Sequence, residues 1–302
     1  MMNYCIETKN LTKRYGNYNA VNHVNFHLEK GKIYGLIGKN GAGKSTLIKL
    51  LMGLSRPTSG QVEMFGTSKN LHKQRANIGF MMADNFYPYL SAKQNLHYFR
   101  KIKGIKDKKE VDRVLKLVEL DGVKKPFKAY SLGMKQRLSL ANALMGYPDI
   151  ILMDEPINGL DPQGIADFRR MILKINQEEK TTFLISSHIL SELDKVAHVF
   201  GFIDQGKLLA ELSHEEIEQK CGQYLMVETD RLVEARADLL NHFNFEKVEL
   251  SDNQLKVYGQ TVESHEIAKY LVDRGYKLQR LAYNRLTLED FFLQLIGGHN
   301  HV

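Results

Sequence analysis

The sequence has few cysteines and no long apolar run, and both absences restrict what the protein can be. Its 302 residues include two cysteines, Cys5 and Cys221, far apart and without ligand-like neighbours. This usage favours reduced thiols over a disulfide framework or a zinc site. No apolar segment approaches the roughly 20 residues needed to cross a bilayer, and the N-terminus shows no cleavable export signal. We therefore expect a soluble, cytoplasmic chain that meets a membrane only through a partner.

Acidic residues are too few to balance the basic ones, and the imbalance is local. The net charge is +7, yet residues 221–302 hold 9 Lys and Arg against 12 Asp and Glu, leaving 33 against 23 for residues 1–220. The densest basic segment, 99–137, is compatible with solvated helix faces, with a surface near anionic lipid or an acidic partner, and with a nucleic-acid groove. Because aromatic residues do not interleave with these cations, we expect no nucleic acid partner.

The run 38–46, Gly-Lys-Asn-Gly-Ala-Gly-Lys-Ser-Thr, has the pattern of a nucleotide phosphate loop. An apolar strand-like segment, 33–37, precedes it, and a segment of helical periodicity, 47–52, follows it. The alternative is a plain glycine-rich turn, but glycines at these positions let backbone N–H groups converge on phosphates. The helix start, a lysine for the β- and γ-phosphates and a hydroxyl for Mg²⁺ complete an ATP or GTP site. The predicted binding residues are Gly38, Asn40, Gly41, Ala42, Gly43, Lys44, Ser45 and Thr46, with Ser45 also a metal ligand.

Residues 149–156 read as a buried parallel strand that ends in two carboxylates. Such a strand end delivers side chains to the crevice where ligands bind. We expect Asp154 to hold Mg²⁺ and Glu155 to orient or deprotonate the attacking water. The alternative is a capping or surface pair of acids. Two charged side chains directly after a buried strand cost free energy, however, which favours a functional role.

Residues 130–137, Tyr-Ser-Leu-Gly-Met-Lys-Gln-Arg, lie between these two motifs, and Ser131 is a natural helix N-cap. The order of motifs resembles the ATP-binding subunits of ABC transporters, whose signature is usually written Leu-Ser-Gly-Gly-Gln. Here Leu132 replaces the first glycine and Met134 the glutamine. This form is similar to the one common in bacitracin- and lantibiotic-export ATPases.

The resemblance implies roles for further residues. Tyr15 matches the aromatic that stacks on adenine, although a turn tyrosine at the sheet edge would look the same. Asp161 matches an aspartate at the dimer interface, and His188 matches the switch histidine that senses the γ-phosphate and holds the water with Glu155. In that arrangement Ser131 and Gly133 of one subunit close over the ATP bound by the other.

One group that the family usually has is missing. A glutamine normally follows an Ile-Gly strand and ligates magnesium, but the segment after Ile78 and Gly79 has Ala83 and Asp84 instead. Asp84 could substitute as a metal ligand or water holder, because a carboxylate suits this hard ion. Simple loss of the contact is the alternative.

The rest of the chain predicts an α/β fold with two domains. Segments 5–11 and 21–28 read as strands of a small antiparallel sheet, and 91–147 as mostly helical, with helices at 92–102, 109–118 and 136–145. The mixed sheet core resumes at 149–154, 181–186 and 199–204. We expect residues 1–218 to form an ABC-type phosphate-loop NTPase domain with a helical subdomain at about 90–147.

Residues 219–302 lack ATPase motifs and predict a small α+β domain. Strands at 224–229, 247–250, 255–257 and 278–282 alternate with helices at 232–243 and 263–273. This order is the ferredoxin-like split βαβ arrangement. A capped helix starts at Thr287.

The resemblance implies an ATP hydrolase that works as a head-to-tail dimer, most simply a homodimer, and drives a separate membrane permease. The implied ligands are ATP and Mg²⁺, the implied place is the cytoplasmic face of the cell membrane, and the implied cargo is an exported peptide, antibiotic or lipid-like molecule. Two alternatives remain: a soluble ABC ATPase acting on nucleic acid or the ribosome, and a regulatory module that binds ATP without hydrolysing it. The first lacks the tandem domains or long insertion that it would need, and the second would be expected to lack Glu155 or His188.

Overall fold

The computed structural model describes residues 4–81, 86–220, 223–251, 253–259, 262–285 and 287–299, with the backbone alone for 297–299. The chain forms two compact units, Met1–His214 and Glu215–Val302, and each is described by itself. The sequence prediction places the division at residue 218. The thiol of Cys5 is buried and is not part of a disulfide.

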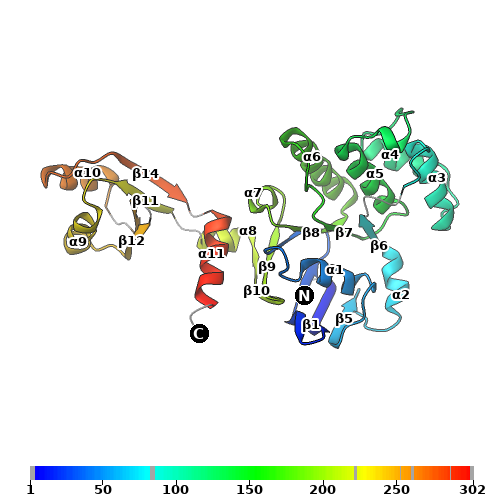
Figure 1. Ribbon diagram of the computed structural model, residues 1–302, viewed down its shortest axis with the longest axis horizontal. Coiled ribbons are helices and arrows are strands. Elements are labelled where there is room, and N and C mark those ends of the chain that lie inside the picture. Colours follow the sequence, from blue (N-terminus) through cyan, green and yellow to red (C-terminus); the bar gives the residue numbers. More distant parts are fainter. Residues whose placement is uncertain are drawn as a thin grey trace. The chain divides into compact units, whose positions relative to one another are not determined.

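The centre of the first unit is a six-stranded sheet of order β10-β9-β4-β8-β7-β6 (Figure 1). The parallel pairs are β4 with β8 and β9, and β7 with β6 and β8, while β10 runs antiparallel to β9 at the edge. Every residue of β4 and β8 is buried, as expected for central strands covered on both faces. The strands are β4 (Ile33–Ile37), β6 (Ile78–Met81), β7 (Ile150–Asp154), β8 (Thr182–Ser187), β9 (Val199–Asp204) and β10 (Lys207–Ser213).

A small antiparallel sheet and helix α1 (Lys44–Leu51) cover one face of this core (Figure 1). The sheet contains β1 (Tyr4–Tyr15), β2 (Tyr18–Val24), β3 (His27–Glu29) and β5 (Ser59–Met64). The prediction of one strand over 21–28 was wrong. Between β2 and β3, Phe26 exchanges hydrogen bonds with Thr8. The strand is interrupted there, and β2 and β3 pair with different parts of β1. The shared apolar core includes Ile6, Leu11, Leu36, Leu47, Leu51 and Leu152.

Helices α6 (Pro162–Glu179) and α7 (Leu190–Leu193) lie on the opposite face of the sheet (Figure 1). In α6 the buried residues Phe168, Met171, Ile172 and Ile175 recur at spacings of three and four, so one stripe of the helix faces the core.

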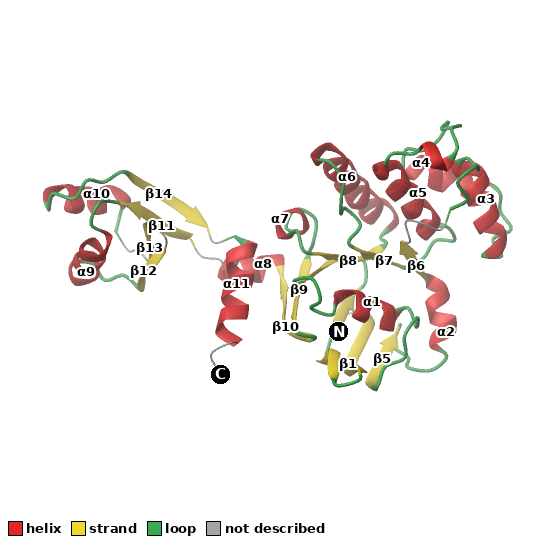
Figure 2. Cartoon of the chain, in the orientation of Figure 1, coloured by secondary structure: helices red, strands yellow, loops and turns green. Residues whose placement is uncertain are grey.

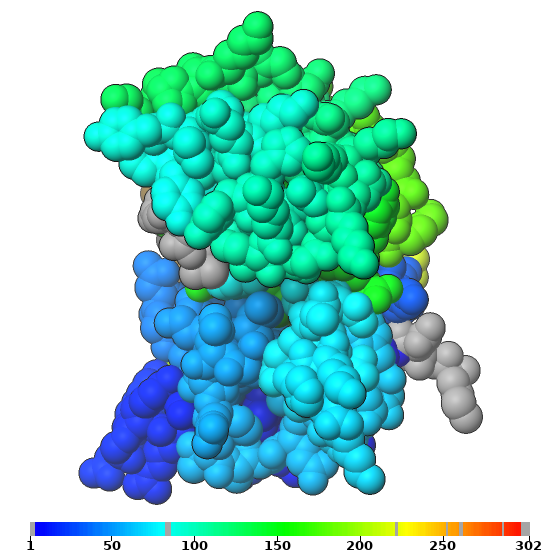
Figure 3. Space-filling model, turned by 90° about the vertical axis from the view of Figure 1, so that its right-hand side faces the viewer, coloured from blue at the N-terminus to red at the C-terminus, as the bar shows by residue number. Residues whose placement is uncertain are grey.

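A helical part lies beside the sheet and contains α3 (Ala92–Ile102), α4 (Lys109–Leu117), the short η2 (Phe127–Ala129) and α5 (Leu132–Leu144). Figure 3 shows these residues as one continuous block above β5, α2 (Leu71–Gln74) and η1 (Arg75–Asn77). Helix α3 has the bounds predicted from its periodicity, helped by a capping box in which Ser91 and Gln94 satisfy each other's backbone N–H groups. Helix α5 begins four residues earlier than predicted, because Ser131 caps it and Leu132 already belongs to its first turn.

The second unit begins at Glu215, within α8 (His214–Lys220), and contains a four-stranded antiparallel sheet of order β12-β13-β11-β14. The elements follow as β11 (Gln223–Glu228), α9 (Leu232–His242), β12 (Lys247–Ser251), β13 (Gln254–Tyr258), α10 (Ser264–Asp273), β14 (Arg280–Arg285) and α11 (Leu288–His299) (Figure 2). This is the element order predicted from the sequence, and the ferredoxin-like assignment stays a prediction. Apolar residues of α9, α10 and the sheet form their own core, including Leu225, Val227, Leu239, Leu255, Val257 and Ile267.

None of the described helices is long and apolar enough to span a membrane.

Candidate functional site: a phosphate loop and a separate signature surface

The phosphate loop connects β4 to α1 and depends on glycine for its shape. Gly43 has φ +113°, and a Cβ atom there would lie 2.4 Å from the carbonyl oxygen of Ala20. A Cβ at Gly38 would lie 2.5 Å from the carbonyl oxygen of Ile203, so the loop fits tightly against β9. Any side chain at these two positions would push the loop out of place, which explains the glycines in physical terms.

Lys44 is buried, and its ammonium group lies inside the curl of the loop. Its Nζ donates hydrogen bonds to the carbonyl oxygens of Gly38 at 2.6 Å and Lys39 at 3.2 Å. It also lies 3.2 Å from Oε1 of Glu155. That third contact is an ion pair by distance but not a hydrogen bond, since Glu155 Oε1 has no hydrogen-bond partner among the described atoms. The lysine charge is thus balanced by an acid within ion-pair distance.

A cavity of about 410 Å³ opens over this loop. Its size falls in the range of small-molecule sites. Six of the eight predicted loop residues line it, and the other two, Gly38 and Ala42, contribute to the packing of the loop instead. The lining residues are Tyr15, Tyr18, Ala20, Lys39, Asn40, Gly41, Gly43, Lys44, Ser45, Thr46 and Glu155.

Tyr15 and Tyr18 present exposed aromatic rings at the rim of this cavity. The two side chains are 51% and 55% exposed. The ammonium of Lys13 lies 4.9 Å from the centre of the Tyr15 ring, and the Tyr18 hydroxyl donates to the Gly41 carbonyl at 3.2 Å. Tyr18 is not among the residues predicted from the sequence, where it appears only as a second aromatic residue across the turn from Tyr15. A flat ring at either position can stack on a base.

The acidic end of β7 faces the same cavity through Glu155. Its Oε2 lies 2.8 Å from Nδ1 of His188, which follows β8. An ionised carboxylate only accepts hydrogen bonds, so the imidazole carries its proton on Nδ1 in this contact. Asp154 is tied instead to Ser186, whose hydroxyl donates to Oδ1 at 2.7 Å. The predicted water-activating pair, Glu155 and His188, is therefore in direct contact.

Ser45, which lines the cavity, and Asp154, at the end of β7, are oxygen donors of the type that suits a magnesium ion held mainly by phosphates. Mg²⁺ typically takes one or two protein oxygens and completes its shell with substrate phosphates and water. Ser45 offers a hydroxyl and Asp154 a carboxylate for this purpose. Within the described part of the chain no group of three or more His, Cys, Asp or Glu could hold a metal alone. The predicted contribution of Asp84 lies outside the described residues.

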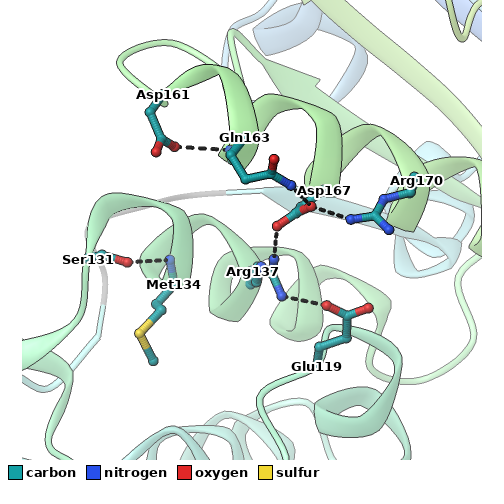
Figure 4. Close-up of polar contacts among 9 residues, drawn as sticks. Glu119, Ser131, Met134, Arg137, Asp161, Gln163, Asp167 and Arg170 are labelled. Carbon is teal, nitrogen blue, oxygen red and sulfur yellow. Dashed lines mark hydrogen bonds and ion pairs between the residues drawn. The ribbon is translucent and has the colours of Figure 1, made fainter.

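Ser131, Gly133 and Asp161 line a second cavity, of about 650 Å³, that shares no lining residue with the first. Ser131 caps α5 by accepting from the N–H of Met134 at 3.3 Å, and Asp161 caps α6 by accepting from the N–H of Gly164 at 3.0 Å (Figure 4). Two helix N-termini, with their partial positive charge, thus border one concave surface. We call it the signature surface.

Ion pairs and leucine contacts join the two sides of the signature surface. Arg137 of α5 reaches Glu119 at 2.7 Å and Asp167 of α6 at 3.2 Å, and Asp167 also contacts Gln163 and Arg170 (Figure 4). Beside this network Leu132 packs on Gly159, where a Cβ would come within 3.1 Å of the leucine.

This geometry can bind a nucleoside triphosphate at the loop and activate a water at Glu155. The signature surface offers hydrogen-bond donors to a second ligand or subunit. A phosphate loop alone leaves part of the γ-phosphate in water, and helix N-termini are suited to bind such an anion. Because both surfaces are predicted to meet ATP and yet have no residue in common, two copies of the chain offer the simplest way to bring them together.

Comparisons with known proteins agree with this arrangement. A family model described as ABC transporter matches residues 21–158. The bacitracin transport ATP-binding protein BcrA of Bacillus licheniformis is 39% identical, with 98% of this chain and 99% of that protein aligned. The lantibiotic transport ATP-binding protein SrtF of Streptococcus pyogenes is 38% identical over its whole length, covering 75% of this chain. Among solved structures, a dimeric ATP-binding cassette in a post-hydrolysis state with ADP and Pi is 26% identical, with a TM-score of 0.62 over 69% of this chain and 98% of that one.

Proposed function

Since the chain belongs to the ABC transporter ATP-binding family, as its similarity to BcrA along nearly its whole length shows, we propose that it powers the export of a peptide antibiotic through a separate permease. The protein is an ATP hydrolase of the ABC type. The proposal adds the cargo class, the permease, a homodimer and a position on the cytoplasmic face of the membrane. The relatives named for bacitracin and lantibiotic transport support the cargo class.

The observation that carries the proposal is the position of Glu155, which lines the cavity beside Lys44 and also contacts His188. Lys44 and the loop would hold the β- and γ-phosphates, and the adjacent carboxylate would take the proton of the attacking water while His188 orients it. Bound Mg²⁺, held by Ser45 and Asp154, would neutralise charge that builds up on the phosphates. Tyr15 or Tyr18 would stack on the adenine.

The signature surface supplies the second half of the proposed site. In a head-to-tail dimer Ser131, Gly133 and the start of α5 in one subunit would donate to the γ-phosphate held by the other, next to Asp161. ATP would thus close the pair and hydrolysis would reopen it. The two alternatives, an ATPase for nucleic acid or the ribosome and a non-hydrolysing module, find no support among the similar proteins.

The C-terminal unit is proposed to be an accessory domain that adjusts dimerisation or contact with the permease. A quarter of this chain has no counterpart in SrtF, which is matched over its whole length. A relative named for lantibiotic transport and ATP binding therefore matches this chain without that quarter.

The proposal is tested by recovering the permease with the tagged chain from membranes and expressing both in a peptide-sensitive host. We expect increased tolerance of bacitracin or of a lantibiotic with the parent chain, and no increase with Glu155→Gln at the same protein level. Equal tolerance with both chains would refute ATP-driven export, and failure to recover any integral membrane protein would refute the permease partnership.

A further inference from the structure

Ser186 is a fully buried serine that contacts both acidic residues at the end of β7. In the parallel pair of β7 and β8 it lies directly beside Asp154. Its hydroxyl donates to Oδ1 of Asp154 at 2.7 Å and accepts from the backbone N–H of Glu155 at 3.1 Å. The same N–H lies 3.2 Å from the Ser186 carbonyl oxygen, so it is shared between two acceptors of one residue.

These bonds fix the hydroxyl and the two acids relative to one another. A serine hydroxyl has one proton, and when Asp154 accepts it, the lone pairs that remain face the Glu155 N–H. Glu155 has φ +50°, a left-handed conformation that is unusual for a residue with a side chain. Such a conformation typically costs about 1–3 kcal/mol and persists only where the surroundings enforce it. Ser186 accepts from the N–H of this residue with its hydroxyl and its carbonyl oxygen, and on the other side the Glu155 carbonyl accepts from the Asn158 N–H at 3.3 Å.

We propose that Ser186 is a positioning residue for ATP hydrolysis. By binding Oδ1 it sets the direction in which the other oxygen of Asp154 meets the metal shell. By holding the Glu155 N–H it keeps the left-handed turn that brings that carboxylate to Lys44 and His188. One hydroxyl therefore aligns the metal-binding acid and the water-activating acid with each other, without touching the nucleotide.

The neighbouring Ser187 provides a matched comparison within the same strand. It is equally buried, but its hydroxyl accepts from the N–H of Ile189 at 3.0 Å and stabilises the turn before α7. A loss of packing or of a generic buried hydroxyl would affect both serines alike. Only Ser186 contacts the two acids.

The test compares Ser186→Ala with Ser187→Ala in the full-length protein. Mn²⁺ binding in the presence of ADP is measured by electron paramagnetic resonance, and ATP binding is measured separately in excess EDTA. Loss of an outer-shell partner typically weakens metal binding or activity by about 10–100-fold, so we expect a loss of this size in Mn²⁺ affinity and in turnover for Ser186→Ala. ATP binding in EDTA should be unchanged, and Ser187→Ala should retain parental Mn²⁺ affinity.

The inference rests on the proposed roles of Asp154 and Glu155. The variant Asp154→Asn distinguishes a failure of those roles from a failure of the role of Ser186. If Asp154→Asn keeps parental Mn²⁺ affinity, the metal assignment itself fails. If Asp154→Asn loses affinity and Ser186→Ala does not, or if Ser187→Ala loses as much, the positioning role of Ser186 is refuted. Thermal unfolding in EDTA checks that the variants fold. If Ser186→Ala does not fold, Ser186→Cys keeps a weaker hydrogen-bond donor and should show a smaller loss of Mn²⁺ affinity and turnover. Parental values for Ser186→Cys would also refute the role.

Discussion

Replacing Glu155 with glutamine tests the centre of the proposed mechanism, because the change keeps the shape of the side chain and removes its charge. The carboxylate lies 2.8 Å from His188 and is the acid nearest to Lys44 in the cavity. General-base assistance typically contributes about 10²–10⁴-fold to a rate, and we expect hydrolysis to fall by that order. The ATP-closed dimer should then accumulate.

The same change should tighten ATP binding, since Glu155 competes with the γ-phosphate for the lysine. At 3.2 Å two unit charges attract by about 1 kcal/mol in a water-like dielectric and about 5 kcal/mol at an effective dielectric of 20. Lys44 is buried but Glu155 is partly exposed, so we adopt the smaller figure. An attraction of about 1 kcal/mol corresponds to roughly fivefold tighter binding once the charge is removed.

The assay combines phosphate release, titration with a fluorescent ATP analogue in EDTA, and light scattering with ATP. Glu178→Gln, an exposed change on α6, is the control and should match the parent in all three. Lys44→Ala should show neither a dimer nor turnover. Parental hydrolysis by Glu155→Gln would refute the catalytic assignment and make His188 the group to test, while unchanged or weaker ATP binding would refute the competition between carboxylate and phosphate.

Three further predictions concern stability and organisation. Burial, together with the charges of Lys32 and His214, lowers the pKa of His198, whose Nδ1 accepts from the Ile33 N–H. Below about pH 6.5 the folded state therefore binds fewer protons than the unfolded state, and the free energy of unfolding should fall on acidification. Thermal unfolding at pH 7.5 and 5.5 should show this loss of stability, and a smaller loss in His198→Asn. Gly159→Ala should lower the melting temperature because of its φ of +78° and the nearby Leu132, and Leu132→Ala should restore only the steric part; a fully additive double variant would contradict this contact. A chain ending at residue 218 should still bind ATP by titration, and a truncated chain that does not fold would show that the boundary is wrong.

Local pattern predicted the elements whose signals are contiguous in the sequence. The apolar periodicity of 92–102 predicts α3, and the apolar run 199–204 predicts β9, in both cases with the observed bounds. Strands β5 and β10 were not predicted, because exposed and half-buried residues give β5 and β10 no clear apolar alternation. Their place depends on pairing with β1 and β9, which the sequence does not encode locally.

The candidate site divides in the same way. The phosphate loop, the paired acids and the switch histidine are short motifs, and the structure places Glu155 in contact with both Lys44 and His188. The roles expected of these residues stay predictions. Ser186 and Tyr18 were missed. The first depends on the register between β7 and β8, and the second on a turn that brings its hydroxyl to Gly41; neither leaves a local pattern.

The short segment from Glu155 to Asp161 belongs to both surfaces of the first unit. It starts at Glu155, the proposed water-activating acid, turns back on itself through the bond from the Asn158 N–H to the Glu155 carbonyl, and ends at the cap of α6 beside Leu132. In a head-to-tail pair, a shift of the acid toward one nucleotide would therefore be felt a few residues later by the surface that closes over the other. The two nucleotide sites of such a pair would therefore be coupled, and hydrolysis at one site would change the rate of the cycle at the other.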